Sequence, residues 1–201
     1  RYRANPVSAV TEITLATRSK WLDKKSNSYK EWTSYHHIKV EGNLVEQALS
    51  NSDKGDIILV HGYLSDIKTN KPVVKSELST STESIVHANF IQRFNKGYTQ
   101  SINNILCSAQ LASMPQLVTT QNNKQLVQVN ISINQQDYSV DKQCWQTHKV
   151  EREVHVWGKQ AQYLVENAQL GDNVMVEGKL SYLATADKKQ FIDAKMVHLI
   201  T

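Results

Sequence analysis

Apolar and polar residues alternate along much of this chain, the pattern expected of strands with one buried face. Residues 13–15 and 127–133 show the alternation most clearly, and strongly apolar stretches follow at 56–64 and 172–180. A glycine precedes each apolar stretch and ends the short helix that we expect before it. The predicted helices span about 43–50 and 159–167, and the predicted last strands span 85–94 and 191–200.

The predicted elements occur twice, and three glycine-anchored segments recur at one spacing of 116 residues. Val40-Glu41-Gly42 recurs as Val156-Trp157-Gly158, Gly55-Asp56 as Gly171-Asp172, and His61-Gly62-Tyr63-Leu64 as Glu177-Gly178-Lys179-Leu180. Upstream, residues 10–15 resemble residues 127–132 at an offset of 117. Three matches in register are improbable by chance, so we infer an internal duplication. We expect a first domain at 1–95 and a second at 101–201.

Strands dominate each copy, and one short helix precedes the last two strands. That order is typical of the OB fold, a five-stranded Greek-key barrel, so we predict an all-β protein with two tandem OB folds. The second copy has a further opening strand at 102–111, which the first copy lacks. Because a barrel without its first strand exposes sheet edges, we expect that strand upstream of Arg1, with a strand from another chain as the alternative. The linker 95–100 is short, so we expect the domains to lie close together.

Composition and charge permit a nucleic-acid partner without requiring one. The chain has 201 residues, 40% of them hydrophobic, with a formal net charge of +4 and a sequence pI near 8.9. The start lacks the apolar segment of a signal peptide and no apolar run is long enough to cross a bilayer, so we expect a soluble cytoplasmic protein without a membrane partner. Cys107 and Cys144 form no Cys-x-x-Cys motif and no zinc-finger pattern, so we expect no metal and no other cofactor.

Motifs that carry catalysis are missing from the sequence. It contains no phosphate-binding loop of the Gly-x-x-x-x-Gly-Lys-Ser/Thr type and no Gly-x-Ser-x-Gly elbow. His36 and His37 are neighbours on a predicted strand, so they should point to opposite faces and cannot hold one metal ion together. The carboxylates are scattered, without a pair suited to acid and base roles. We therefore expect a binding protein and not an enzyme.

Several motifs follow one order along the chain. The first copy carries Arg1-Tyr2, Ala9-Val10-Thr11-Glu12-Ile13, Lys20-Trp21-Leu22-Asp23-Lys24, Tyr35-His36-His37-Ile38 and Lys54-Gly55-Asp56. The second carries Ile102-Asn103-Asn104-Ile105, Val156-Trp157-Gly158-Lys159 and Val176-Glu177-Gly178-Lys179-Leu180. Together these segments resemble the bacterial single-stranded DNA-binding protein (SSB) family, and the resemblance covers most of the chain.

The resemblance implies a function, a partner and an assembly. Proteins of this family bind single-stranded DNA with little sequence preference, in replication, recombination or repair. Most use four OB folds, so a chain with two OB folds would reach four as a homodimer. A bacterial, nucleoid-associated location follows, with an organellar one not excluded. The family often has an acidic tail that recruits other proteins, whereas this sequence stops within the last predicted strand.

The segment 18–35 is the strongest candidate for DNA contact. Sequence-tolerant binding needs cations for the phosphates and aromatic rings for stacking on the bases. The segment has five cations, namely Arg18, Lys20, Lys24, Lys25 and Lys30, interleaved with Trp21, Tyr29, Trp32 and Tyr35. Its Ser26-Asn27-Ser28 is a plausible hairpin tip. His37 and Lys68 complete the predicted binding residues of the first copy.

The second copy offers a thinner set of binding residues. We predict contacts from Trp145, Arg152, Trp157 and Lys159. Glu151 occupies the position of Tyr35 and would repel phosphate, while Glu41 of the first copy occupies the position of Trp157. Residues 1–95 contain 13 Lys and Arg against 10 Asp and Glu, while the remainder contains 10 against 9. We therefore expect the first domain to make the main DNA contact.

Two other functions fit the same fold. An OB surface can dock proteins, as in a primosome or replication assembly, and the acidic residues Glu41, Glu151 and Glu177 favour such a module with weak nucleic-acid binding. OB folds also bind RNA, and the sequence does not separate a DNA binder from an RNA binder.

Overall fold

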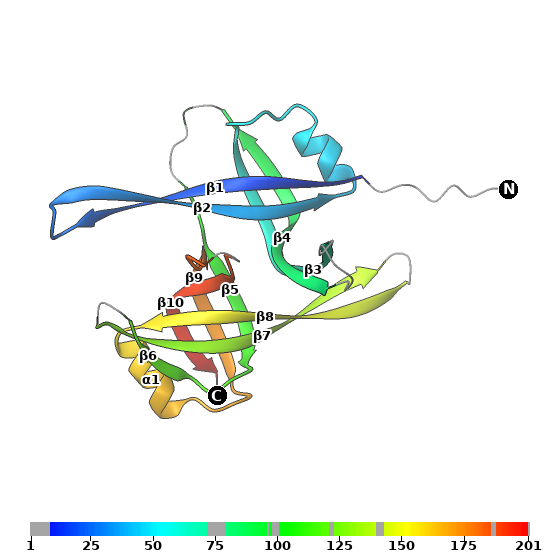
Figure 1. Cartoon of the computed structure of the whole chain (residues 1–201). Coiled ribbons are helices and arrows are strands. Elements are labelled where there is room, and N and C mark those ends of the chain that lie inside the picture. The colour runs from blue at the N-terminus through cyan, green and yellow to red at the C-terminus, as the bar shows by residue number, and fades with distance from the viewer. Residues whose placement is uncertain are drawn as a thin grey trace. The chain divides into compact units, whose positions relative to one another are not determined.

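The chain divides into two compact units, residues 1–102 and 103–201. We describe each unit by itself from a computed structural model (Figure 1). The structure describes residues 9–71, 79–95, 97, 101–120, 123–139, 143–185 and 188–200.

Unit 1 is a four-stranded sheet in the order β1-β2-β4-β3. Its strands are β1 (Val10–Asp23), β2 (Ser28–Glu41), β3 (Ile57–Lys71) and β4 (Ser79–Phe94). β1 and β2 form an antiparallel hairpin, β2 and β4 are parallel, and β3 and β4 are antiparallel. Within the described residues of this unit, β1 and β3 are the two edge strands.

Unit 2 is a closed barrel, because β5 pairs with β9 on one side and with β7 on the other. The sheet order is β5-β9-β10-β8-β7-β6. Its strands are β5 (Ile105–Leu111), β6 (Gln116–Thr119), β7 (Gln125–Ser139), β8 (Cys144–Trp157), β9 (Asn173–Tyr182) and β10 (Gln190–Ile200). The predicted opening strand of the second copy is therefore present, and the short strand β6 was not predicted.

The predicted all-β class with two tandem OB folds is confirmed. In both units a long hairpin leads to a helical segment, an antiparallel strand pair follows, and its last strand lies parallel to the second hairpin strand. The helix α1 (Lys159–Asn167) has the predicted bounds and buries Ala161 and Leu164 against the barrel. In unit 1 the helical segment is shorter than predicted, with π-helical bonding at Val45–Leu49. None of the helices in the described ranges is long and apolar enough to span a membrane.

The strand register corrects one detail of the predicted repeat. Thr11 pairs with Val40, and Val127 pairs with Val156. Because Val40 and Val156 are equivalent, Thr11 corresponds to Val127, and the offset along the first hairpin strand is 116 and not 117. A shift of one residue would exchange the buried and exposed faces of the strand, so the barrel core excludes the offset of 117.

Each unit has its own core on the inward-facing side of its sheet. The core side chains come from the predicted apolar stretches. In unit 1, Ile38, Val40, Ala88 and Ile91 form a buried cluster, with Ile13 among the residues packed against it. Unit 2 supplies most of the fully buried side chains among the described residues, including Val127, Val154, Val156, Val174 and Ile192. Burial of such a side chain contributes about 1.5–3 kcal/mol.

Gly178 and Gly62 occupy equivalent places where two strands approach closely. A Cβ atom at Gly178 would lie 2.5 Å from the carbonyl oxygen of Asp193 and 2.9 Å from the Cα of Ala194. A Cβ atom at Gly62 would lie 2.1 Å from the carbonyl oxygen of His87. The repeated glycine is therefore required by the contact between the last two strands of each unit.

Substitution Gly178→Ala should destabilise unit 2 by about 1–3 kcal/mol, because the added methyl group must displace backbone atoms of β10. The measurement is urea unfolding followed by tryptophan emission in a Trp21→Phe/Trp32→Phe background, in which the remaining tryptophans belong to unit 2. The exposed Ser108→Ala on β5 is the control and should leave the midpoint within error. Equal midpoints for the two variants would contradict the steric argument.

Candidate nucleic-acid interface

The β1–β2 hairpin extends beyond the rest of its sheet (Figure 1). Its two strands pair over their full length, from Val10 opposite Glu41 to Asp23 opposite Ser28. Among the described residues, β4 pairs with β2 only at Ile38 and Lys39. In the described part of unit 1, the segment from residue 18 to residue 35, which we call the arm, is therefore a two-stranded ribbon without a third strand.

The turn of the arm is organised by Asp23. Its Oδ1 accepts a hydrogen bond of 3.1 Å from the backbone N–H of Lys25, and its Oδ2 accepts one of 3.1 Å from the hydroxyl of Ser26. The ammonium group of Lys30 forms an ion pair with the same carboxylate. The hydrogen bond from Lys30, followed by those from Lys25 and Ser26, lowers the pKa of Asp23 to about 2. Asn27 completes the turn with a positive φ of 47°.

The four aromatic side chains of the arm are exposed. Trp21 is 45% exposed, Tyr35 59%, Trp32 61% and Tyr29 68%. Transfer of a large ring out of water is favourable, so the exposure of these rings on a polar ribbon marks a surface for a ligand. Stacking of a nucleobase on such a ring is worth about 1–3 kcal/mol.

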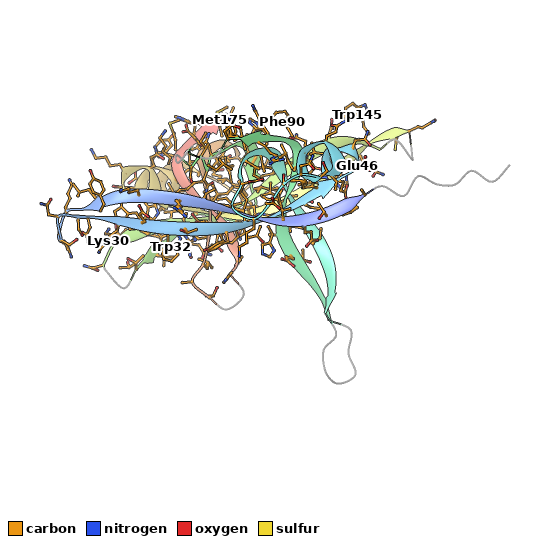
Figure 2. All side chains as sticks on the ribbon, turned by 90° about the horizontal axis from the view of Figure 1, so that it is seen from above. Lys30, Trp32, Glu46, Phe90, Trp145 and Met175 are labelled. Atoms are coloured by element: carbon orange, nitrogen blue, oxygen red, sulfur yellow. The ribbon has the colours of Figure 1, made fainter. Side chains whose placement is uncertain are left out.

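The five cations of the arm are also exposed. Lys30 is held by Asp23 in the turn, whereas the contacts of Lys20 are weak. Lys20 lies 3.8 Å from a carboxylate oxygen of Glu31, and its ammonium nitrogen lies 5.0 Å from the ring centre of Tyr29. Exposed ion pairs of this kind contribute at most about 1 kcal/mol. Phosphate groups can therefore replace these contacts at little cost. Figure 2 labels Lys30 and Trp32 on the arm.

The adjacent histidines point to opposite faces of β2, as predicted. His36 is buried, and its Nε2 lies 2.8 Å from the hydroxyl of Thr17. Burial lowers the pKa of His36 and so favours the neutral form of its imidazole. His37 is exposed, with its Nδ1 2.9 Å from a carboxylate oxygen of Glu83. Lys68 lies on β3, but its side chain is outside the described residues.

Arg152 does not lie where a phosphate contact requires it, and its predicted role is wrong. The residue is 3% exposed. Its Nε donates a hydrogen bond of 2.8 Å to Oε1 of Gln190, and one of its terminal nitrogens donates a bond of 2.8 Å to the backbone carbonyl of Glu151. Arg152 occupies the position of His36 on the inward-facing side of the strand, which explains the burial. The repeat aligns Arg152 with His36, but the sequence analysis assigned neither residue to the inward face.

The other predicted residues of unit 2 are accessible. Trp145 lies near the start of β8 and is 68% exposed, at the position of Tyr29 in unit 1 (Figure 2). Trp157 is 40% exposed, and its Nε1–H donates a hydrogen bond of 3.1 Å to Asp193, which orients the ring. Lys159 is exposed beside it, and both line a surface depression of about 1000 Å³ between α1 and the β6–β7 hairpin. The arrangement offers one oriented ring and one cation.

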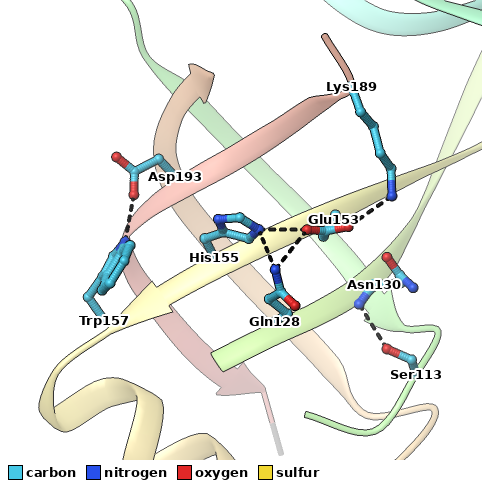
Figure 3. A network of polar contacts seen from close by, with 8 residues as sticks. All are labelled: Ser113, Gln128, Asn130, Glu153, His155, Trp157, Lys189 and Asp193. Carbon is cyan, nitrogen blue, oxygen red and sulfur yellow. Dashed lines mark hydrogen bonds and ion pairs between the residues drawn. The ribbon is translucent and has the colours of Figure 1, made fainter. Parts of the chain in front are cut away.

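A polar network formed by β7, β8 and the residue before β10, which the sequence analysis missed, lies on unit 2 (Figure 3). A carboxylate oxygen of Glu153 lies 2.6 Å from Nε2 of His155, and the other lies 2.8 Å from the ammonium nitrogen of Lys189. Gln128 bridges Glu153 and His155 at 3.4 and 3.3 Å. Burial acts to raise the pKa of Glu153, but the hydrogen bonds from Lys189 and His155 outweigh it and lower that pKa.

The two units place the carboxylate of one cross-strand polar contact on different strands. In unit 1 the imidazole of His37 lies on the second hairpin strand and the carboxylate of Glu83 lies on the last strand. The equivalent positions of unit 2 hold the carboxylate of Glu153 and the ammonium of Lys189. The hairpin strand of unit 2 therefore presents Glu151 and Glu153 where unit 1 presents Tyr35 and His37. That surface of unit 2 is more acidic and less suited to phosphate.

Comparison with known proteins gives one family and one fold. The model of the single-strand binding protein family matches residues 3–93 and again residues 102–200. The wild-type single-stranded DNA binding protein from Thermus aquaticus superposes with a TM-score of 0.73 at 22% identity, over 99% of this chain and 85% of that chain. A deletion mutant of that protein gives a TM-score of 0.73 at 21% identity, over 99% and 87% of the two chains. At this identity the two structures show a shared tandem fold.

The turn geometry predicts an unusually acidic carboxyl group at Asp23. The side-chain carbon signal of Asp23 should titrate in NMR with a midpoint near 2, and Lys30→Met should raise that midpoint because it removes the largest stabilising contact. Since the folded pKa is depressed, the turn contacts are complete above the usual Asp range and are lost as the pH falls toward 2. Glu31→Gln, on the other face of the arm, is the control. An unchanged midpoint in Lys30→Met would contradict the assignment.

Proposed function

The chain belongs to the single-strand binding protein family, and from that premise we propose that it binds single-stranded DNA with little sequence preference, mainly through the arm of unit 1. The observation that carries the proposal is the exposure of four aromatic rings and five cations on one narrow ribbon. Rings and cations are the two groups that sequence-tolerant recognition needs. We propose that the protein acts by binding and not by catalysis, in the cytoplasm, during replication, recombination or repair.

In this proposal the residues of the arm divide into two roles. The rings of Trp21, Tyr29, Trp32 and Tyr35 stack on bases, which any base permits because each has a flat apolar face. Arg18, Lys20, Lys24, Lys25 and Lys30 contact phosphates. If all five neutralise a phosphate, the logarithm of affinity should fall with the logarithm of salt concentration with a slope of about −3.5. His37 extends this surface along β2, and Lys68 stays a predicted contact whose side chain is outside the described residues.

Unit 2 has a smaller role in the proposed complex. Trp157 and Lys159 can hold one base and one phosphate, and Trp145 adds a ring on the hairpin of this unit. Glu151 and Glu153 oppose phosphate at the positions that Tyr35 and His37 hold in unit 1. The acidic surface also supports the alternative function, docking of a protein in a replication assembly. RNA is the alternative nucleic acid, and competition between dT and rU oligonucleotides distinguishes the two.

The test of the main proposal is a titration with a dT oligonucleotide of about 35 nucleotides at low and high salt, followed by tryptophan emission. Wild-type emission should be quenched, and binding should weaken with salt. Trp21→Ala should weaken binding about 5- to 150-fold, because one stacked base contributes about 1–3 kcal/mol. The matched control is Tyr163→Ala, which removes an exposed ring from α1 and should leave the affinity unchanged. Absence of binding at low salt would exclude the proposal and favour a protein partner.

We also propose that two copies of the chain associate, which brings four OB folds together. The outer face of β5 and β9 exposes Leu106 and Met175, an apolar pair that a second copy would cover (Figure 2). Sedimentation equilibrium should give twice the chain mass of 22.8 kDa. Leu106→Lys should shift the mass toward a single chain, while Gln169→Lys, which adds the same charge at an exposed position after α1, should leave the mass unchanged. A wild-type mass of one chain would contradict the association.

A further inference from the structure

The register of the arm divides its aromatic rings between two faces. Residues directly opposite each other share a face, and the face alternates along each strand. Leu15 opposite His36 lies on the core-facing side of the hairpin. Steps of two residues carry that side outward to Ser19 opposite Trp32 and to Trp21 opposite Lys30. Both tryptophans of the arm therefore lie on the side of the hairpin that, further from the turn, faces the core. We call this side the tryptophan face.

The tryptophan face has no protein layer over it in the arm, since Trp32 and Trp21 are both exposed. The two residues are diagonal neighbours, about 7–8 Å apart between backbone positions. Lys30 lies on the same face directly opposite Trp21, and its ammonium group forms an ion pair with Asp23 of that face. Ser19, opposite Trp32, is short and leaves the ring uncovered. Two adjacent rings beside an ammonium group form a platform that matches bases joined by phosphate.

The opposite side, which we call the tyrosine face, carries Tyr29 and Tyr35. Ala16 lies opposite Tyr35 and is too small to cover its ring. The two tyrosines are six residues apart on β2, so their backbone positions are about 20 Å apart. Arg18, Lys20 and Glu31 lie on this face between them, so the face has a net positive charge. A ligand that contacts both rings must be extended, and the net charge of the face favours an anion.

Cations lie at the tip of the arm, where the two faces meet. Lys24 and Lys25 are exposed in the turn between β1 and β2. No other described strand of unit 1 lies beside the two strands here, so a polymer can pass around the tip. We propose that one strand of DNA contacts both faces of the arm and crosses from one to the other at this turn. The inference rests on the proposed function and adds the tryptophan face as a second stacking surface for the same strand.

Binding of one strand to both faces makes the faces thermodynamically coupled. Removing rings from the tyrosine face must weaken the occupancy of the tryptophan face, although no residue of the tryptophan face has changed. Two separate strands, one on each face, would leave the tryptophan face unaffected. The experiment therefore measures occupancy of one face while the other face is altered.

The experiment uses the full chain with Trp145→Phe and Trp157→Phe, so that all tryptophan emission comes from Trp21 and Trp32. A dT oligonucleotide of about 35 nucleotides is titrated into this protein, and anisotropy of a fluorescein-labelled copy of the oligonucleotide reports binding independently. Emission should be quenched on binding. Adding Tyr29→Ala and Tyr35→Ala should move the midpoint of quenching to at least about tenfold higher DNA concentration and leave the quenching at saturation unchanged. Thr33→Ala, on the tyrosine face between those residues, is the matched control and should move the midpoint less than about twofold.

Any other outcome of the titration would contradict a specific part of the proposal. Binding by anisotropy without quenching would exclude the tryptophan face while the proposed function stands. Quenching with an unmoved midpoint in the tyrosine variant would exclude a shared strand. Emission that changes with protein concentration before DNA is added, and that DNA does not alter, would assign the platform to a second copy of the chain. No anisotropy change with the wild-type chain would instead contradict the proposed function itself.

Discussion

The two-residue period of the long hairpins constrains every other feature of this protein. On β2 this period places Ile38 and Val40 in the core and directs the side chain of the residue between them outward. His36 lies inside and His37 outside for the same reason. A slip of one residue would bury charged groups and expose the core, so packing in the barrel also determines which side chains a ligand can reach. The binding surface and the core are therefore specified together by one register.

Duplication has preserved that register and changed the surface around it. The inward position of β2 holds His36, and its counterpart on β8 holds Arg152, each with its own buried polar partners. The outward positions diverge further, since the carboxylate lies on the last strand in unit 1, at Glu83, and on the hairpin strand in unit 2, at Glu153. Outward positions can change with little effect on packing, because they contact solvent and only one or two neighbours. Two barrels of one architecture therefore present different electrostatic surfaces.

The arm shows how a part of the fold without a core is kept in one conformation. Between the turn and Ile38, β1 is the only described strand that pairs with β2. A two-stranded ribbon of this kind is marginally stable alone. The ladder of paired backbone groups runs to the last residues before the turn, and Asp23 holds the turn through contacts with Lys25, Ser26 and Lys30. The aromatic side chains can consequently remain exposed, since the backbone and the turn maintain the ribbon without burying them.

Alternation, glycine spacing and the cluster of aromatic and basic residues were sufficient to predict the strands, the duplication, the bounds of α1 and the arm as candidate site. These features are local, or they repeat at a constant spacing, so sequence reasoning can detect them. The burial of Arg152 and the network around Glu153 were not predicted, because residues 148–153 are largely polar on both faces of the strand and the pattern does not show which face turns inward. That choice depends on Gln190 and Lys189, which approach from β10, about forty residues further along the chain. The closure of the second barrel likewise depends on β5 pairing with two distant strands. Local chemistry determined where this protein can form strands and expose rings, and long-range strand pairing decided which charged groups face the solvent.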